Sequence, residues 1–309
     1  MNREAVKTED AAGRVKTLVV TGATRGLGRL VAEGAALRGA RVVLACRDPV
    51  RGAEARDAVA RMAADKAAEA ARAGAARVVE PQRPELLVLD LASLASVRRA
   101  AEEARARFPR IDVLVNNAGT FSRSHSESRD GFELSMATNY LGPFLFTRLL
   151  LPSMAPAGRI VNLSSDAYPW GRASLGKPAR GGVWAGFMNY AASKRAILQF
   201  TLALAAREGR RGPEGLRVNA LHPGVVRTEI MRMRTWYGFI VDLILAPFFQ
   251  PPDEGVGMIL DLALSEAFAE ASGGYYRKGR REEPRRSVAE AGRIEALWEE
   301  SSRLVGLEP

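Results

Sequence analysis

Tyr190 and Lys194, in the segment Tyr190-Ala-Ala-Ser-Lys194, have the residue types and the spacing for acid-base chemistry. On a helix, positions i and i+4 share a face, so the phenol and the ammonium would point into the same space. A free tyrosine, with a pKa of roughly 10, is a poor acid-base group at neutral pH. A nearby cation favours the phenolate and lowers the pKa of the phenol. Taken alone the pair is a weak signal, because the same spacing also arises on surface helices.

A glycine-rich turn upstream gives this pair a context. The run Val15–Val20 is typical of a buried parallel strand, and it leads into Thr21-Gly22-Ala-Thr-Arg25-Gly26-Leu-Gly28 and a helical stretch over 29–38. The three glycines would let a pyrophosphate reach the unpaired N–H groups and the positive dipole end of this helix. A tight turn without a ligand is the alternative. The order strand, turn, helix favours a nucleotide site, although the spacing differs from the general G-x-G-x-x-G fingerprint.

Together these features resemble the short-chain dehydrogenase/reductase family, over nearly the whole chain from Lys16 to Gly306. Further matching segments follow in order: Asp90-Leu91, Asn116-Asn117-Ala118-Gly119, Asn139 within Thr-Asn-Tyr-Leu-Gly, Ser164-Ser165 after Arg159-Ile-Val-Asn-Leu, and Pro223-Gly224 with Thr228. Within the family, Ala45-Cys46-Arg47-Asp48 and the ending from Trp298 to Leu307 resemble the retinol-dehydrogenase and WW-domain-oxidoreductase-like branch.

The resemblance implies a catalytic tetrad of Asn139, Ser165, Tyr190 and Lys194. Tyr190 would give its proton to a carbonyl oxygen as hydride leaves the nicotinamide, and Lys194 would lower the pKa of Tyr190 and hold the nicotinamide ribose. Ser165 would hydrogen-bond the substrate oxygen, with Ser164 as the neighbouring alternative. Asn139 would kink its helix around a water that links to Lys194, unless it is a polar side chain facing solvent. All four positions carry the expected types, which predicts an active alcohol or ketone oxidoreductase.

Two arginines predict NADP(H) as the cofactor. After the second strand, an NAD site usually carries an acid for the ribose 2′-hydroxyl, whereas here Arg47 follows Cys46. Together with Arg25 in the glycine turn, Arg47 could grip a 2′-phosphate through charge-assisted hydrogen bonds. Asp48 would weaken that grip if its carboxylate turned inward. Two exposed arginines without a ligand are the alternative.

The resemblance implies further cofactor contacts. Asp90 would accept a hydrogen bond from the adenine amino group, or it could cap the helix that starts near Ser93. The small residues after Asn116 would let the backbone approach the cofactor ribose, and Asn116 itself is as readily structural as ligand-binding. Thr228 would contact the nicotinamide carboxamide. The expected cofactor-binding residues are Gly22, Thr24, Arg25, Gly26, Leu27, Gly28, Arg47, Asp90, Leu91, Asn117, Ala118, Gly119, Tyr190, Lys194, Pro223, Gly224, Val225 and Thr228.

Composition limits the classes of protein. A length of 309 residues with 47% hydrophobic content suffices for one sizeable core. The chain has no run of 18 apolar residues, and its first residues lack the apolar core of a secretory signal. One cysteine and two histidines argue against a structural zinc site, and the single Cys46 favours a reducing cytoplasm. The net charge of +10 comes from scattered arginines without interleaved aromatics, which predicts a basic surface and no nucleic-acid site.

Strands and helices alternate along the chain, which predicts a single-domain α/β Rossmann fold, a doubly wound parallel sheet of about seven strands with helices on both faces. We expect a disordered tail over 1–13, one domain over 14–309, and an extended surface helix within 51–80. The resembled family often pairs subunits through the helices expected near 132–153 and 188–208, which leaves a homodimer open. Strands are expected at 15–20, 41–45, 86–89, 111–115, 159–163, 216–221 and 274–276, and the other helices at 26–38, 93–107, 253–267 and 287–304.

Aromatic-rich segments predict a hydrophobic alcohol, aldehyde or ketone as the substrate. The apolar segment 236–249, within an expected lid over 227–252, is a core helix, a cover over the substrate or a contact with a membrane surface. The insert 166–188 would form the other wall. A retinoid-like compound and a secondary-metabolite ketone both fit. His125 and His222 need no catalytic role.

Two rival functions are less favoured. A sugar-nucleotide epimerase or dehydratase also uses Tyr-x-x-x-Lys, but its usual glycine turn is G-x-x-G-x-x-G. A non-catalytic NADP-binding regulator or scaffold would tend to lack the serine, the tyrosine or the lysine, and this chain keeps all three.

Overall fold

The chain folds around one eight-stranded sheet. The structure, a computed structural model, describes residues 13–75, 80–122, 126–172, 175, 178, 180–224 and 252–309. The strand order is β3-β2-β1-β4-β5-β6-β7-β8, and all neighbours are parallel except β7 and β8. The strands are β1 (Thr17–Thr21), β2 (Arg41–Cys46), β3 (Glu85–Val88), β4 (Ile111–Asn116), β5 (Met154–Leu163), β6 (Arg217–His222), β7 (Tyr275–Arg277) and β8 (Arg280–Glu282).

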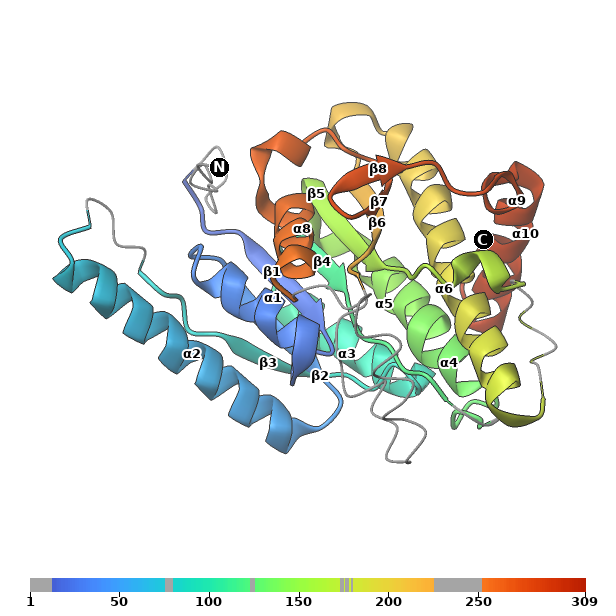
Figure 1. The fold of residues 1–309 in the computed structure, drawn as a ribbon, viewed down its shortest axis with the longest axis horizontal. Coiled ribbons are helices and arrows are strands. Elements are labelled where there is room, and N and C mark those ends of the chain that lie inside the picture. The colour runs from blue at the N-terminus through green and yellow to red at the C-terminus, as the bar shows by residue number, and fades with distance from the viewer. Residues whose placement is uncertain are drawn as a thin grey trace.

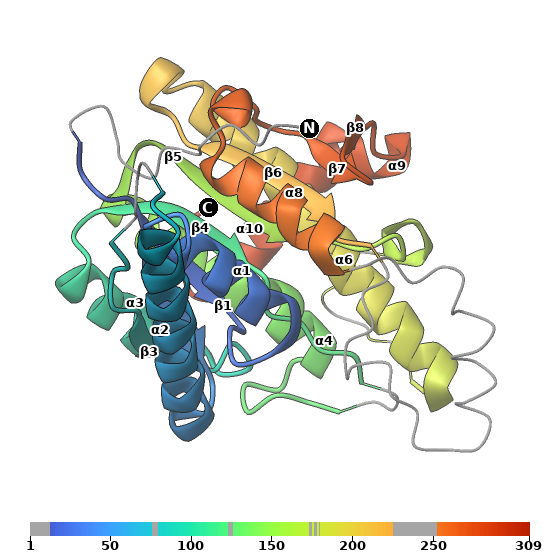
Figure 2. The same cartoon turned by 60° about the vertical axis from the view of Figure 1, so that its left-hand side comes forward.

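Helices cover both faces of this sheet (Figure 1 and Figure 2). Helices α1, α2 and α8 share one apolar core with the strands, and α3, α5, α6 and α10 share the other. The predicted doubly wound α/β fold is therefore confirmed. The helices are α1 (Gly26–Ala36), α2 (Pro49–Arg72), α3 (Leu94–Arg107), α4 (Leu134–Met136), α5 (Gly142–Leu150), α6 (Gly182–Gly209), α8 (Pro252–Leu264), α9 (Arg286–Ala289) and α10 (Ala291–Leu304).

The long surface helix expected within 51–80 is present as α2, which reaches past the edge of the sheet (Figure 1). It begins where the Asp48 carboxylate accepts hydrogen bonds from the N–H groups of Val50 and Arg51, with Pro49 at the first helical position. This is a favourable helix start, because the side chain satisfies two N–H groups that have no partner within the helix.

The sheet carries one strand more than the prediction. Strand β8 pairs antiparallel with β7 through a two-residue turn, in which Lys278 and Gly279 both have positive φ. A turn of this kind matches the twist of the two strands, and glycine favours it. The three residues of β8 are polar and exposed, so their sequence lacks the apolar pattern of a strand. They end the sheet with charged side chains, a common protection of an edge.

The helix expected over 132–153 is not continuous. Between α4 and α5 the chain forms a π-helical turn, Ala137–Leu141, and a 3-10 turn follows over Leu151–Ser153. Helix α5 then starts at Gly142, where a Cβ atom would overlap the main chain of Leu91. The interruption places Asn139 at the centre of the wide turn, and such turns occur often at functional sites.

Several expected segments lie outside the described residues. They are the tail over 1–13 apart from Gly13, the lid over 227–252 apart from Pro252, the apolar segment 236–249, part of the insert 166–188, and His125. The domain boundaries stay predictions.

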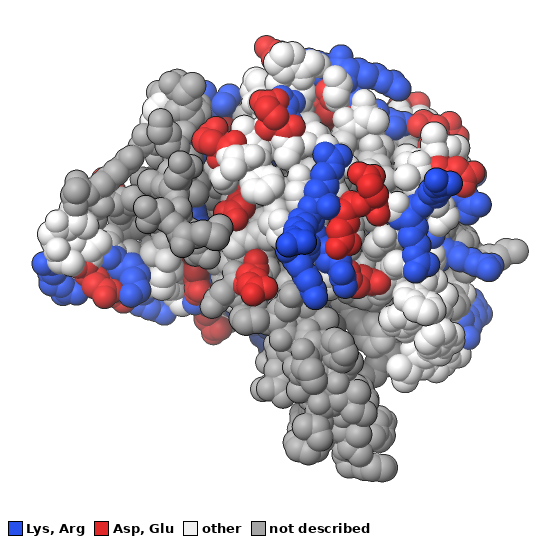
Figure 3. Space-filling model, turned by 45° about the horizontal axis from the view of Figure 1, so that its top comes forward, with Lys and Arg blue, Asp and Glu red and all other residues white. Residues whose placement is uncertain are grey.

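Basic and acidic side chains are interspersed on the face shown in Figure 3, so the basic excess does not gather there. Within the described part of the chain, no helix has the length and hydropathy needed to cross a bilayer.

Candidate active site

Tyr190, Lys194 and Ser165 come together at the carboxyl end of β5. Tyr190 and Lys194 lie one turn apart on α6, and the Lys194 Nζ atom is 5.7 Å from the centroid of the Tyr190 ring. Ser165 follows β5, and its side chain forms a hydrogen bond with that of Tyr190. A phenol, an amine and a hydroxyl thus share one corner of the molecule.

The two consecutive serines have different partners. The Ser164 hydroxyl is buried and donates to the main-chain carbonyl of Lys194 at 2.8 Å, which ties β5 to α6. Ser165 pairs with Tyr190, and its Oγ atom also accepts from the Ala167 N–H at 3.2 Å. Of the two alternatives, the structure places Ser165 against the phenol.

Burial governs the proton affinities of Lys194 and Tyr190. The Lys194 ammonium donates to the Leu163 carbonyl at 2.8 Å, and burial lowers its pKa to about 8. Burial also raises the pKa of Tyr190, an effect that the hydrogen bond with Ser165 partly offsets. This direction is opposite to the lowering expected from the sequence, because the loss of hydration around the phenol dominates. At neutral pH Tyr190 is a protonated phenol, which is the form that can donate a proton.

Asn139 is buried, so the alternative of a solvent-facing side chain is wrong. Its amide nitrogen donates to the Thr120 carbonyl at 2.9 Å and to the Ser193 hydroxyl at 3.0 Å, while its oxygen accepts from the Thr120 N–H at 2.7 Å. These bonds join the wide turn to α6 and to the loop after β4. Gly119 lies beside the pair: a Cβ atom there would be 3.5 Å from both Asn139 Oδ1 and Lys194 Nζ.

The glycine turn leads into the start of α1. Gly22 and Gly26 have φ of +69° and +57°, a region that favours glycine. No side chain caps the start of helix α1, so no capping side chain would compete with a phosphate for the N–H groups of its first turn. The glycines also serve packing, because a Cβ atom on Gly28 would overlap Asn117.

Asn117 and Ala118 are held against this turn. The Asn117 amide donates to the Thr21 carbonyl at 2.7 Å, and the Thr21 hydroxyl accepts from the N–H groups of Asn117 and Ala118 at 3.1 and 3.0 Å. The ends of β1 and β4 are thereby joined, and the small residues expected near the cofactor ribose lie beside the glycine turn.

Arg25 and Arg47 are exposed and follow β1 and β2, which pair in parallel up to Thr21 and Ala45. The Asp48 carboxylate is turned to the start of α2, where it accepts from two N–H groups. It therefore does not turn inward against a phosphate, which was the objection to an NADP site. Both arginines therefore follow neighbouring strands at the same edge of the sheet.

Two of the residues considered from the sequence make contacts within the protein. The Asn116 amide is buried and donates to Thr147 Oγ1 at 3.0 Å and Asn162 Oδ1 at 2.8 Å, which favours the structural interpretation. Asp90 does not cap α3: its Oδ1 atom accepts from the Ala92 N–H at 3.0 Å, and Ser93 is the capping residue. The Asp90 carboxylate stays half-buried at the end of β3.

The remaining expected cofactor contacts differ in exposure. Leu27 and Leu91 are buried in the two cores, so they would offer a cofactor their main chain rather than their side chains. Thr24 is half-buried in the glycine turn. Pro223 and Gly224 follow β6 and reach the same edge of the sheet as Ser165. Val225 and Thr228 lie outside the described residues.

The structure also brings to this edge side chains that the sequence did not single out. Asp166 comes directly after Ser165, His222 ends β6, and Tyr275 and Arg277 lie on β7. The Asp166 carboxylate contacts all three of the others. The available signal was the position of three of them: Asp166, His222 and Arg277 stand at or beyond the ends of three consecutive strands.

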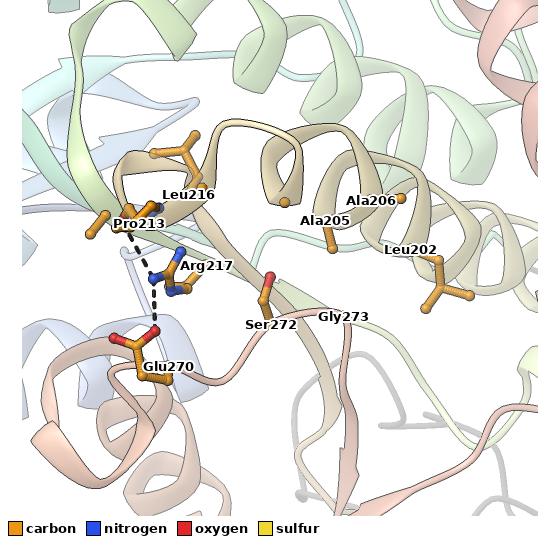
Figure 4. Close-up of a pocket in the computed structure, with 12 residues that line it drawn as sticks. Leu202, Ala205, Ala206, Pro213, Leu216, Arg217, Glu270, Ser272 and Gly273 are labelled. Atoms are coloured by element: carbon orange, nitrogen blue, oxygen red, sulfur yellow. Dashed lines mark hydrogen bonds and ion pairs between the residues drawn. The ribbon is translucent and has the colours of Figure 1, made fainter.

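A hollow of about 710 Å³ lies elsewhere, at the amino ends of β6 and β7, beside the second half of α6 (Figure 4). Its polar groups are paired within the protein, since Arg217 contacts Glu270 at 2.8 Å and Ser272 accepts from the Val218 N–H. It contains none of the expected site residues. Among the described residues, no cluster of three His, Cys, Asp or Glu side chains could hold a metal ion.

Residues 16–236 match the family described as short chain dehydrogenase. Human retinol dehydrogenase 14 is 36% identical over 302 residues, which cover 94% of this chain and 87% of that protein. The protein named as daunorubicin C-13 ketoreductase DnrU, from Streptomyces sp. (strain C5), is 37% identical over 298 residues, which cover 94% of this chain and 93% of that protein. A solved structure of a blue fluorescent protein from a metagenomic library, in complex with NADPH, has a TM-score of 0.65 at 26% identity over 87% of this chain and 96% of that one. The chain therefore belongs to the short-chain dehydrogenase family and is an oxidoreductase of its retinol-dehydrogenase-like branch.

Proposed function

We propose that this protein interconverts a carbonyl and an alcohol on a hydrophobic substrate, with NADP(H) as cofactor and Tyr190 as the acid-base group. The observation that carries the proposal is the convergence of Tyr190, Ser165 and Lys194 beyond the carboxyl ends of the strands. Open α/β sheets bind their ligands at this edge.

Each of these three side chains has a separate role in the proposed reaction. The nicotinamide cofactor, when bound, supplies or accepts the hydride. Tyr190 gives its hydroxyl proton to the carbonyl oxygen in reduction and takes it back in oxidation. Ser165 donates a hydrogen bond to the same oxygen and holds it beside the phenol. Lys194 places a positive charge 5.7 Å from the phenol ring, which stabilises the phenolate that remains after proton donation.

Carbonyl reduction is expected to slow as the pH rises through about 8, the lowered pKa of Lys194. Below that pH the lysine is charged and favours proton donation by Tyr190, whereas above it the lysine is neutral and the phenolate loses this stabilisation. The measurement is kcat for reduction as a function of pH at saturating cofactor. In Lys194→Arg, which stays charged, the decline should move to higher pH. An unmoved decline would show that another group titrates.

NADP(H) is favoured over NAD(H) by the two arginines at the ends of β1 and β2. Arg25 and Arg47 are exposed there, and the Asp48 carboxylate is engaged by the start of α2. A guanidinium group suits a phosphate because it presents several donors in a fixed plane. The structural relative that was solved with NADPH supports the same choice.

Replacing Arg47 with aspartate is expected to weaken NADPH binding by about 10–100-fold, since a hydrogen bond to a charged group contributes about 1.5–3 kcal/mol. NADH, which lacks the 2′-phosphate, should be affected much less. Dissociation constants for both cofactors, from fluorescence titration, measure the effect. Arg61→Asp makes the same charge change on the exposed side of α2 and serves as the control. Equal losses for NADPH and NADH would show that Arg47 does not contact the 2′-phosphate.

Aromatic side chains near Tyr190 support a hydrophobic substrate. The Phe121 ring meets the Tyr190 ring edge-on, with centroids 5.8 Å apart. Trp184 and Phe187 stack on one another at the start of the same helix. Trp170 and Trp184 are 61% and 68% exposed, and large exposed rings often mark a binding surface. The names of the two relatives suggest retinal and daunorubicin as the first compounds to test.

The function is tested with a panel of carbonyls, followed by NADPH absorbance: retinal, daunorubicin, other ring-bearing ketones and a small polar ketone. We expect turnover of at least one hydrophobic compound and little of the polar one. Cofactor binding without turnover across the panel would favour the non-catalytic regulator instead.

The helices that the resembled family uses for pairing are partly occupied within this chain. Helix α10 packs on α5 and α6, and Trp298 lies between the rings of Phe144 and Phe200 and the guanidinium groups of Arg148 and Arg207. A second copy would have to displace α10 to use the same surface. We therefore propose a monomer rather than the homodimer left open by the sequence. A cytoplasmic location and a peripheral membrane contact stay predictions.

A further inference from the structure

Charged and polar side chains surround the carboxylate of Asp166, the residue after Ser165. None of these side chains has a part in the mechanism above. Arg277 Nε donates to both oxygens of Asp166, at 3.0 and 2.8 Å. The Tyr275 hydroxyl donates to Oδ1 at 3.3 Å, and His222 Nε2 lies 3.4 Å from Oδ2. One acidic side chain is thus held by two neighbouring strands.

The order of the strands explains why these residues meet. Strands β5, β6 and β7 are consecutive in the sheet, and His222 stands opposite Arg277 in their register. The turn after β7 brings Glu282 of β8 back beside Arg277, with Arg277 Nη1 and Glu282 Oε1 3.6 Å apart. The β7–β8 hairpin therefore carries the arginine that holds the residue next to the candidate catalytic serine.

A second contact joins the same two segments. The Ser165 carbonyl accepts from the Tyr168 N–H at 3.0 Å, which closes residues 165–168 into a turn. The Tyr168 ring meets the Tyr275 ring edge-on at 5.3 Å, and its hydroxyl accepts from the Arg285 N–H at 3.4 Å. The turn is thus attached to the hairpin and its continuation at both ends, by Asp166 and by Tyr168.

The pair of Arg277 and Asp166 acts on orientation more than on stability. Their side chains are 37% and 39% exposed, and ion pairs with this exposure contribute little to the free energy of unfolding. The hydrogen bond with Asp166 raises the pKa of Arg277, and burial raises the pKa of Tyr275, so both remain donors at neutral pH. The carboxylate keeps its position as long as these donors are present.

We propose that Arg277 is a positioning residue for the reaction: through Asp166 it holds the turn 165–168 and so fixes the Ser165 hydroxyl against Tyr190. This role rests on the function proposed above. Ser165 must reach the phenol and the substrate oxygen at the same time, and a misplacement of about 1 Å can lower a rate about 100-fold. The glycine turn and Arg47 follow β1 and β2, which β4 separates from β5, so we expect the affinity for NADPH to change little when this contact is lost.

Arg277→Gln is the direct test. We expect kcat for carbonyl reduction to fall about 10–100-fold, with the dissociation constant for NADPH unchanged. Arg280→Gln removes an exposed arginine from the other strand of the same hairpin and should leave kcat unchanged. Asp166→Asn should lower kcat to a similar extent, and the double variant should be no slower than either single one, because both act through one contact. Additive losses in the double variant would contradict a shared role.

Hydrogen exchange separates positioning from a direct action on the substrate. In Arg277→Gln, amide exchange over residues 164–170 should be faster than in the unchanged protein, and in Arg280→Gln it should be the same. Unchanged exchange with a lowered kcat would overturn the positioning role, and so would unchanged kcat. Full activity of Tyr190→Phe would refute the proposed function and this role with it. Full activity of Arg277→Gln beside an inactive Tyr190→Phe would refute this role alone.

Discussion

Tyr190→Phe is expected to lower kcat for carbonyl reduction by ~10²–10⁴-fold, the usual contribution of a general acid. Phenylalanine keeps the ring and its edge contact with Phe121 but has no proton to give to the carbonyl oxygen. It also removes the hydrogen-bond partner of Ser165. The affinity for NADPH should change little, because the glycine turn and the arginines are untouched. Steady-state kinetics on the best substrate of the carbonyl panel, together with fluorescence titration of NADPH, measure both effects.

Tyr276→Phe is the matched control. Tyr276 is a buried tyrosine that packs in the core shared with α1 and α8, on the opposite face of the sheet from α6. Removal of its hydroxyl should leave kcat close to that of the unchanged protein. If Tyr190→Phe retains kcat to the same degree as Tyr276→Phe, the phenol is not the proton donor and the mechanism has to be reassigned.

The parallel sheet could be predicted because each of its strands can be recognised from its own short segment of the sequence. Each of the strands β1 to β6 is a short apolar run followed by a helix, and this alternation permits few topologies. Strand β8 was not predicted, because its pairing depends on the turn at Lys278-Gly279 and not on an apolar pattern. The same holds for the π-helical turn around Asn139: hydrophobic periodicity identifies a helix over 132–153 and is insensitive to a local change of winding.

The candidate site, too, could be predicted only in part from the sequence. Tyr190 and Lys194 share a helix face, so their spacing alone brings them together. The choice between Ser164 and Ser165 came from family resemblance, and the structure gives a physical reason, since Ser164 is bound to the Lys194 carbonyl. The direction of the Tyr190 pKa shift was predicted wrongly, because a sequence does not show the loss of hydration that burial imposes on the phenol.

Contacts between residues that lie far apart in the chain could not be predicted from the sequence. Asp166, His222 and Arg277 are each unremarkable in their own segments, and they meet only because β5, β6 and β7 are adjacent in the sheet. Helix α10 is a comparable case. Its sequence predicts a helix over 287–304, but not that this helix would cover α5 and α6 and complete the core beneath the candidate active site.

This packing makes Trp298 a sensitive position outside the active site. The indole is buried, with the Phe144 and Phe200 ring centroids 5.4 and 5.9 Å away. The guanidinium carbons of Arg148 and Arg207 lie 4.5 and 3.9 Å from its ring, so the indole also accommodates two positive charges. Burial and the nearby Arg207 lower the pKa of Arg148, so its surroundings disfavour the charge of Arg148. The aromatic face offsets part of that cost.

Trp298→Ala is therefore expected to lower the free energy of unfolding by about 3–5 kcal/mol, the usual loss for a buried tryptophan. The substitution leaves a cavity between α5, α6 and α10 and removes the aromatic ring that both guanidinium groups contact. Urea unfolding followed by circular dichroism measures the change. Trp184→Ala, at a position that is 68% exposed, is the control and should change stability by about 0.5 kcal/mol or less. If the two variants lose the same small amount, α10 does not form part of the folded core. If Trp298→Ala instead folds but pairs with a second copy, then α10 is what keeps the surface of α5 and α6 closed to a partner.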